Sequence, residues 1–238
     1  MLTTERHPGD GDAPGVLVAT MDDGKANALS MEMMAAITAA IGEAESDDAI
    51  GAMVLAGRPG VFCGGFDLNV MRGGDATAIT EMVATGGDLV ARLYGSRVPV
   101  VVASTGHAVA AGGFVLLGSD LRIGADGEFN YGLPEVNISM ALPQWAITIA
   151  TERLSKRHLL RSISHGRLTG PSTAVDVGFL DEVVPADLCV DSAVESAMGL
   201  AAAMHLPSYG RIVDSSRTPV IEAITAQAAA DRAAAAQL

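Results

Sequence analysis

Short apolar segments typical of buried strands alternate with segments of helical periodicity along this chain of 238 residues. The strand-like segments span residues 16–21, 52–56, 98–103 and 121–124. Helical spacing of apolar residues is clear in Met34, Ile37 and Ile41, and it recurs after each strand-like segment. This series predicts a single α/β unit, and the alanine-rich segment from residue 190 onward predicts a helical tail.

The composition predicts a core filled mainly by small and aliphatic side chains. Apolar residues make up 49% of the chain, whereas aromatic residues make up only 4%. The longest apolar stretch, residues 108–118, has about half of the roughly 20 residues that a helix needs to cross a bilayer. We therefore expect no transmembrane helix, and we expect no signal peptide because the acidic N-terminal segment lacks an apolar centre.

The charge balance is strongly acidic, with 15 Lys and Arg against 28 Asp and Glu and a net charge of −13. Because no basic run is present, we expect neither a nucleic acid nor a membrane as a partner. Cys63 and Cys189 are too few and too far apart for a disulfide framework, so we expect a cytoplasmic protein. No second metal ligand lies near His107 in the sequence, so we predict no metal site.

A first glycine-rich segment, Phe62–Leu68, reads Phe-Cys-Gly-Gly-Phe-Asp-Leu. Paired glycines allow the backbone to approach a ligand closely and expose N–H groups to it. The same pairs are common in tight turns, so this segment alone leaves both interpretations open.

A second segment, Thr105–Phe114, passes from small residues directly into an apolar helix. The free N–H groups at the start of such a helix stabilise negative charge. The alternative is the close packing of a buried helix. A nucleotide-binding loop is excluded because the segment has neither GxGxxG nor the Walker pattern.

A third segment, Gly132–Val136, contains a single acidic residue, Glu135, after Pro134. Proline followed by glutamate is also typical of the first turn of a helix. In the functional interpretation, Glu135 lies on a loop beside an apolar pocket, where desolvation raises the pKa of its carboxyl group toward that of a useful proton carrier.

Taken together and in order, these segments resemble the crotonase superfamily, which contains the enoyl-CoA hydratases and isomerases. The likeness extends from about Val16 to Pro185. Gly132–Glu135 is similar to the family's G-x-P-E loop, and Phe62–Leu68 to its F-C-A-G-A-D-L loop. The other similar segments are Lys25–Ser30, Gly106–Gly113, Asp120–Ile123 and Ala174–Pro185.

The resemblance implies a crotonase-type α/β spiral of ββα turns, with a catalytic core over residues 1–185. Residues 186–238 are then a helical region that drives oligomerisation and covers an active site, in a homotrimer or a dimer of trimers. The implied substrate is an acyl-CoA of fatty acid metabolism. Coenzyme A enters as part of that substrate, and no other cofactor is expected.

The resemblance also implies the site. Two backbone N–H groups polarise the thioester carbonyl, one from Phe66 and one from Ala111, or from Gly112 if the alignment shifts by one residue. Glu135 is the implied acid and base. Lys25 and Arg58 are candidates for contact with the CoA phosphates, although both are also interpretable as surface charges. The implied substrate-binding residues are Lys25, Ala26, Ala28, Arg58, Gly65, Asp67, Leu68, Phe114, Pro134 and Trp145.

Two departures from the family pattern bear on the reaction. Phe114 stands where a hydratase carries its other catalytic glutamate, and Trp145 follows Pro143 where the family is rich in glycine. Hydration by two carboxylates is therefore not expected, whereas Glu135 alone suffices for an isomerase. A weak hydratase, hydrolysis, retro-Claisen cleavage and an acyl-CoA-binding pseudoenzyme remain alternatives. The retained Glu135 disfavours the pseudoenzyme, because a pure binder gains nothing from a carboxylate beside an apolar chain.

Overall fold

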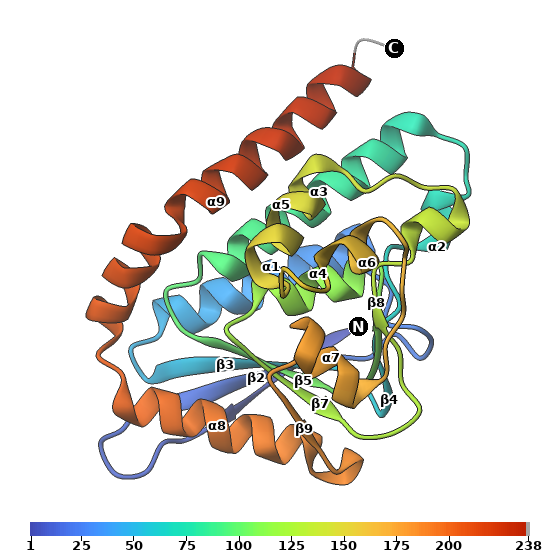
Figure 1. Cartoon of the computed structure of the whole chain (residues 1–238). Coiled ribbons are helices and arrows are strands. Elements are labelled where there is room, and N and C mark those ends of the chain that lie inside the picture. Colours follow the sequence, from blue (N-terminus) through green and yellow to red (C-terminus); the bar gives the residue numbers. More distant parts are fainter. Residues whose placement is uncertain (237–238) are drawn as a thin grey trace.

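The computed structural model describes residues 1–236, which form two β-sheets with helices around them (Figure 1). In the larger sheet β1 pairs antiparallel with β2, and the remaining pairs are parallel. Its strands, in spatial order, are β1 (Leu2–His7), β2 (Gly15–Met21), β3 (Ile50–Ala56), β5 (Val100–Ser104), β7 (Leu121–Ala125) and β9 (Glu182–Val184). The smaller sheet is parallel and consists of β4 (Gly60–Cys63), β6 (Gly106–Val109) and β8 (Tyr131–Gly132).

Consecutive strands enter the two sheets in turn. β3, β5 and β7 belong to the larger sheet, and each is followed along the chain by a strand of the smaller one. Helices then lead to the next turn of the spiral: α2 (Leu68–Met71) and α3 (Ala76–Tyr94) after β4, α4 (Ala111–Gly118) after β6, and the 3-10 helix η1 (Glu135–Ile138) with α5 (Gln144–Arg153) after β8. The predicted α/β fold of ββα turns is thereby confirmed.

Helices cover both faces of the larger sheet (Figure 1). α1 (Met31–Ser46), α3 and α4 lie over one face, and α8 (Cys189–Ala203) lies against the other, in contact with β2, β3, β5 and β7. The alternation of side chains along β2 serves both layers, because Leu17 and Ala19 join the core under α1 while Val16 and Val18 pack with α8. The remaining elements are α6 (Leu159–Ile163), α7 (Pro171–Val177) and the 3-10 helix η2 (Ala186–Leu188).

The strands of the smaller sheet were not predicted from the sequence. The end of β4 lies in the glycine-rich segment Phe62–Leu68, and β6 lies in the segment Thr105–Phe114, for which no strand was predicted. Close approach of their backbones explains the glycines, because a Cβ on Gly106 would lie 2.0 Å from the carbonyl oxygen of Gly60. Glycine at position 106 therefore allows β4 and β6 to pair, although glycine in a sequence usually indicates a turn.

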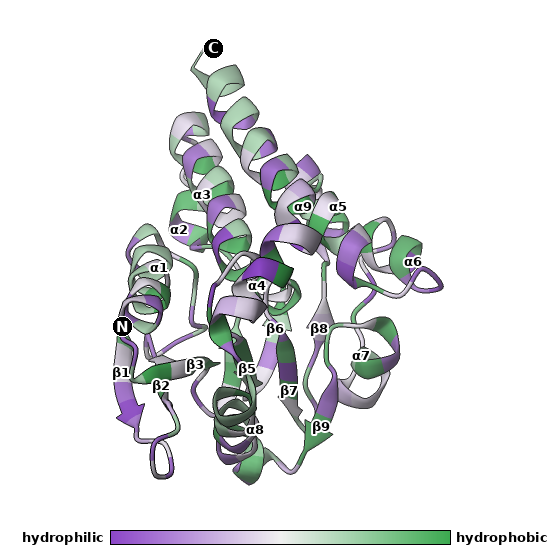
Figure 2. Ribbon diagram, turned by 90° about the vertical axis from the view of Figure 1, so that its left-hand side faces the viewer, coloured by the Kyte–Doolittle hydropathy of each residue, from purple (hydrophilic) through white to green (hydrophobic). Residues whose placement is uncertain are grey.

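The predicted helical tail is present as α8 and α9 (Leu206–Ala235), and α9 packs along α3 and α5 of the same chain (Figure 2). Asp120 fixes the first part of α9, because its carboxylate accepts hydrogen bonds from Tyr209 Oη at 3.0 Å and Arg217 Nη2 at 2.6 Å. The same carboxylate accepts a bond from the backbone N–H of Val100 at 2.8 Å, at the start of β5. This largely buried carboxylate thus joins α9 to the start of β5.

We expect Asp120→Ala to lower the free energy of unfolding by about 3–5 kcal/mol, because it leaves the largely buried Arg217 side chain without its counter-charge. The matched control is Asp214→Ala, which removes an ion pair between α9 and Arg97 whose side chains are both about half exposed. That change should cost no more than about 1 kcal/mol. Urea unfolding of the two variants measures the difference, and equal losses would contradict the role assigned to Asp120.

Candidate active site

The two backbone segments expected to bind a thioester carbonyl lie side by side. A Cβ on Gly65 would lie 3.1 Å from Ala110 Cβ and 3.6 Å from the backbone nitrogen of Ala111. The carbonyl of Gly65 accepts a hydrogen bond from Leu29 N at 2.8 Å. Because the peptide bond is trans, the N–H of Phe66 points away from that carbonyl. The Phe66 N–H is therefore not used in the pairing with Leu29.

The start of α4 supplies the other N–H groups. Ala110, its N-cap residue, adopts a φ of 52°, a conformation rare for a residue with a side chain. Its N–H donates to the carbonyl of Gly132 at 2.9 Å, which fixes the helix start beside β8. The N–H groups of Ala111 and Gly112 lie in the first turn, where no intrahelical acceptor exists. Gly112 packs directly on β4, since a Cβ there would lie 2.3 Å from the carbonyl oxygen of Cys63.

Glu135 reaches the same region from the third strand of the smaller sheet. It is the third residue after β8 and begins the 3-10 helix η1 with Pro134 as its N-cap, which matches the helix-start alternative and differs from the loop of the functional interpretation. The residue is 9% exposed, and its Oε2 atom has no hydrogen-bond partner within residues 1–236. Burial raises the pKa of the carboxyl group from 4.5 to about 7. The side chain is thus a buried acid that exchanges its proton near neutral pH.

An apolar pair includes Phe114, the residue that the family resemblance aligns with the other carboxylate of a hydratase. Phe114 lies on α4 three residues after Ala111, and its ring meets that of Trp145 edge to face with 5.2 Å between centroids. Trp145 is the second residue of α5, and both rings are almost completely buried. The indole N–H of Trp145 has no acceptor within the part of the chain that the structure describes.

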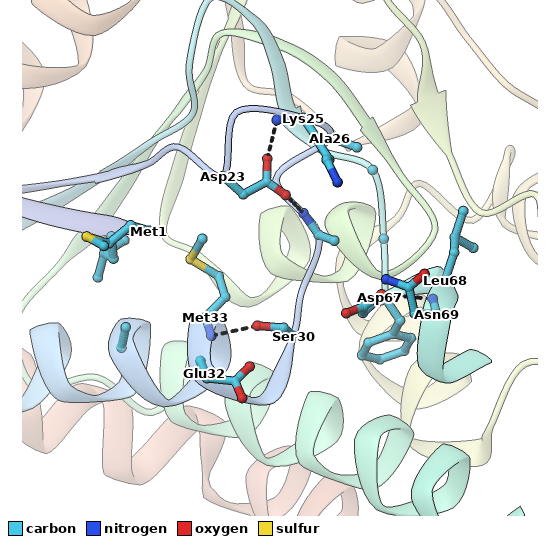
Figure 3. Close-up of a pocket in the computed structure, with 16 residues that line it drawn as sticks. Met1, Asp23, Lys25, Ala26, Ser30, Glu32, Met33, Asp67, Leu68 and Asn69 are labelled. Carbon is cyan, nitrogen blue, oxygen red and sulfur yellow. Dashed lines mark hydrogen bonds between the residues drawn. The ribbon is translucent and has the colours of Figure 1, made fainter. Parts of the chain in front are cut away.

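A cleft of about 760 Å³ opens beside Gly65 and Phe66 (Figure 3). Of the residues that the sequence predicted to bind substrate, it is lined by Lys25, Ala26, Ala28, Gly65, Asp67 and Leu68. Asp67 caps α2 by accepting a hydrogen bond from Asn69 N at 2.8 Å. Phe114, Pro134 and Trp145 do not line this cleft. Phe114 lies on α4, Trp145 lies in the first turn of α5, and Pro134 directly precedes Glu135 as the N-cap of η1.

The loop that carries Lys25 into the cleft is held by two residues that sequence reasoning did not single out. Asp23 accepts hydrogen bonds from the backbone N–H groups of Lys25, Asn27 and Ala28. Figure 3 shows the bond from Lys25. Burial opposes ionisation of Asp23, but these bonds outweigh it and lower the pKa of its carboxyl group. The side chain of Asn27 donates to three backbone carbonyls, one at the end of β2 and two on β4. An Asp-Asp-Gly turn before the motif was the available signal.

Arg58 has a structural contact instead of a place in the cleft lining. Its guanidinium donates to the carbonyl of Lys25 and lies 3.9 Å from the Asp22 carboxylate. Lys25 is the cationic side chain of the cleft, whose lining also includes the acidic residues Asp23, Glu32 and Asp67. Any phosphate bound here therefore meets the ammonium group of Lys25 in a lining that also carries three carboxylates.

Residues 1–236 contain neither a cluster of metal-binding side chains nor a helix of membrane-spanning character. No group of three or more His, Cys, Asp and Glu side chains in this range has the arrangement of a metal site. No helix in the same range combines the length and apolar character that a bilayer crossing requires.

The sequence profile of the enoyl-CoA hydratase/isomerase family matches residues 11–235. The mitochondrial enoyl-CoA delta isomerase 1 of Mus musculus is 32% identical over 175 residues, which cover 73% of this chain and 61% of the mouse protein. An enoyl-CoA isomerase of Mycobacterium tuberculosis superposes with a TM-score of 0.87 at 33% identity, covering 97% of both chains. An enoyl-CoA hydratase of Mycobacterium ulcerans superposes with a TM-score of 0.89 at 32% identity, covering 98% of both chains.

These relatives divide between hydratases and isomerases, so they establish the kind of enzyme and leave its reaction open. The profile match spans nearly the whole chain and includes every segment that forms the candidate site. The chain therefore belongs to the enoyl-CoA hydratase/isomerase family.

Proposed function

We propose that this enzyme moves the double bond of an enoyl-CoA from the β,γ to the α,β position, with Glu135 as its sole acid and base. The observation that carries the proposal is the isolation of this carboxylate. Glu135 is buried with a pKa of about 7, and Phe114 packs against Trp145 where a hydratase has another carboxylate. One carboxylate suffices for proton transfer between two carbons.

In the proposed reaction, the thioester carbonyl accepts hydrogen bonds from the N–H groups of Phe66 and Ala111. The Glu135 carboxylate removes a proton from the α-carbon, and the electron pair of that C–H bond delocalises over the β,γ double bond and the carbonyl as a dienolate. Glu135, now protonated, returns the proton to the γ-carbon. The double bond ends at α,β, and no water, redox cofactor or net proton is consumed. Each N–H donor contributes on the order of 3 kcal/mol in the transition state.

Hydration is the second candidate, because several relatives carry the hydratase name. Adding water to the α,β double bond requires a bound water near the β-carbon and a group that activates it. The two almost fully buried rings of Phe114 and Trp145 offer that water neither space nor a hydrogen-bond acceptor, since the indole N–H is only a donor. The apolar pair therefore favours isomerisation over hydration.

The cleft beside Phe66 suits the CoA portion of the substrate. We assign Lys25 to the CoA phosphates, because it is the cleft's cationic side chain and its backbone is fixed by Asp23. Arg58 supports the same loop through the carbonyl of Lys25 and is assigned a structural role. A homotrimer or a dimer of trimers, with residues 186–238 contributing to assembly, is part of the same proposal.

We expect the purified protein to convert β,γ-hexenoyl-CoA in heavy water to the α,β isomer without adding the mass of one water. Glu135→Gln should reduce kcat/KM at least about a hundredfold, because the amide cannot accept the α-proton. The matched control, Glu195→Gln, changes an exposed glutamate of α8 on the opposite face of the larger sheet and should leave kcat/KM unchanged.

Mass spectrometry and the absorbance of the conjugated thioester measure the products. Addition of water to an α,β-enoyl-CoA at a rate matching or exceeding isomerisation would establish the hydratase. Equal turnover by Glu135→Gln and the wild type would remove Glu135 from the mechanism. Binding of CoA without turnover of either substrate would indicate the pseudoenzyme.

The pKa of Glu135 also predicts a pH dependence of the rate. Because the base acts in its ionised form, kcat/KM should fall about tenfold per pH unit below pH 6 and level off above pH 8, with a midpoint near 7. A midpoint near 4.5, the ordinary value for glutamate, would show that the carboxylate is not desolvated in the working enzyme.

Stability should depend on pH in the opposite sense. A carboxyl group whose pKa is raised on folding binds its proton more tightly in the folded state, so ionising it costs stability as pH rises from 4.5 to about 7. Glu135→Gln removes that cost. Its gain over the wild type should therefore be small at pH 4.5 and reach up to about 3 kcal/mol at pH 8, as measured by urea unfolding. A gain that does not change with pH would contradict the raised pKa.

A further inference from the structure

Two adjacent glycines, Gly86 and Gly87, lie in the middle of the 19-residue helix α3, and both are buried. Glycine in a helix interior costs about a factor of five in the folding equilibrium relative to alanine. Neither residue has the positive φ that would require glycine. The absence of a side chain must therefore serve the packing of something against this part of the helix.

Aromatic rings occupy the space that the missing side chains leave. A Cβ on Gly86 would lie 2.4 Å from Cζ of Phe66, and a Cβ on Gly87 would lie 3.0 Å from Cγ of Trp145. The Gly86 position is also 3.7 Å from Cζ2 of Trp145, so both rings approach the same point on the helix. Phe66 and Trp145 thus lie next to each other, in direct contact with the backbone of α3.

These two rings lie between the candidate site and α3. Phe66 supplies one of the proposed carbonyl-binding N–H groups, and Trp145 meets Phe114, one helical turn beyond Ala111. The Trp145 ring is held between Phe114 on one side and the backbone of Gly87 on another. The Trp145 side chain is 1% exposed and is packed tightly in this position.

We propose that Phe66 and Trp145 form the end wall of the acyl pocket and restrict the substrate to short acyl chains. Gly86 and Gly87 are positioning residues that allow the wall to lie against α3. The proposal rests on the proposed function, because it assumes that the thioester carbonyl binds at the Phe66 N–H. The unpaired indole N–H of Trp145 fits a ring that faces a ligand, since buried indoles in a closed core usually have an acceptor.

Binding of saturated acyl-CoA esters tests the wall without requiring turnover. The series is free CoA, butanoyl-CoA, hexanoyl-CoA and decanoyl-CoA, with affinities from titration calorimetry. For the wild type we expect hexanoyl-CoA to bind more tightly than free CoA and decanoyl-CoA to bind at least tenfold more weakly than hexanoyl-CoA. Trp145 is the only tryptophan of the chain, so its fluorescence should change with hexanoyl-CoA and not with free CoA.

Substitutions of the wall and of its support should act in opposite directions. Trp145→Ala removes the wall, so the affinity ratio of decanoyl-CoA to hexanoyl-CoA should rise at least tenfold; a methylene that becomes buried contributes up to about fourfold. Trp145→Leu is the second variant, because it keeps apolar packing if the alanine variant does not fold. Gly87→Ala pushes the indole into the pocket, so it should weaken hexanoyl-CoA at least fivefold and leave free CoA unchanged.

Gly199→Ala is the matched control, because Gly199 also lies within a helix but nothing lies within 4 Å of the position of its Cβ. It should leave the chain-length profile unchanged. The proposal is overturned if the wild type binds decanoyl-CoA more tightly than hexanoyl-CoA, or if the Trp145 variants and Gly87→Ala keep the wild-type profile. A saturated ester cannot isomerise, so its binding tests the wall independently of the reaction. If the expected chain-length profile is found but the enzyme does not move the double bond of an enoyl-CoA, the proposed reaction is refuted and the proposed wall is not.

Discussion

The parallel pairing of β4, β6 and β8 is the constraint on which the site depends. It aligns β4 with β6, which follows some forty residues later in the chain, and β6 with β8, which follows some twenty-five residues later. The ends of the three strands therefore meet at one place. The hydrogen bond from Ala110 N to the Gly132 carbonyl fixes the start of α4 beside the segment that leads to Glu135. Contact of Gly112 with β4 fixes the same helix start beside Phe66. A shift of one residue in either pairing would separate the carboxylate from the N–H groups.

The larger elements could be predicted from the sequence, because their signals are long and periodic. The apolar segment after Ala110 is a buried helix, as expected, and the residues with helical spacing, Met34, Ile37 and Ile41, lie on α1. The strands of the smaller sheet are only two to four residues long, too short for an alternating pattern, and their glycines indicate turns. Tertiary backbone contacts determine them, and no local signal reports such contacts.

The candidate site, like the fold, could be predicted from the sequence only in part. The sequence pointed to Glu135 through a family pattern, but its 3-10 helix and its unpaired Oε2 depend on how η1 packs against the rest of the fold. The supports around it were missed for the same reason. Asn27 reaches the carbonyls of Val61 and Phe62, and Gly86 lies beside Phe66, across separations of many residues. Such pairs become visible only when the chain is folded.

Aromatic residues are scarce in this chain, so a cluster of them is informative. Five phenylalanines and one tryptophan occur in the chain, and three of these six, Phe66, Phe114 and Trp145, form one group beside the glycines of α3. Elsewhere the core is mainly aliphatic, although Phe62, Tyr131 and Phe179 are also fully buried. Rigid rings fill space with a fixed shape. Because Phe114 lies on α4, Trp145 on α5 and the glycines on α3, a substitution in this group also changes how these three helices pack against one another.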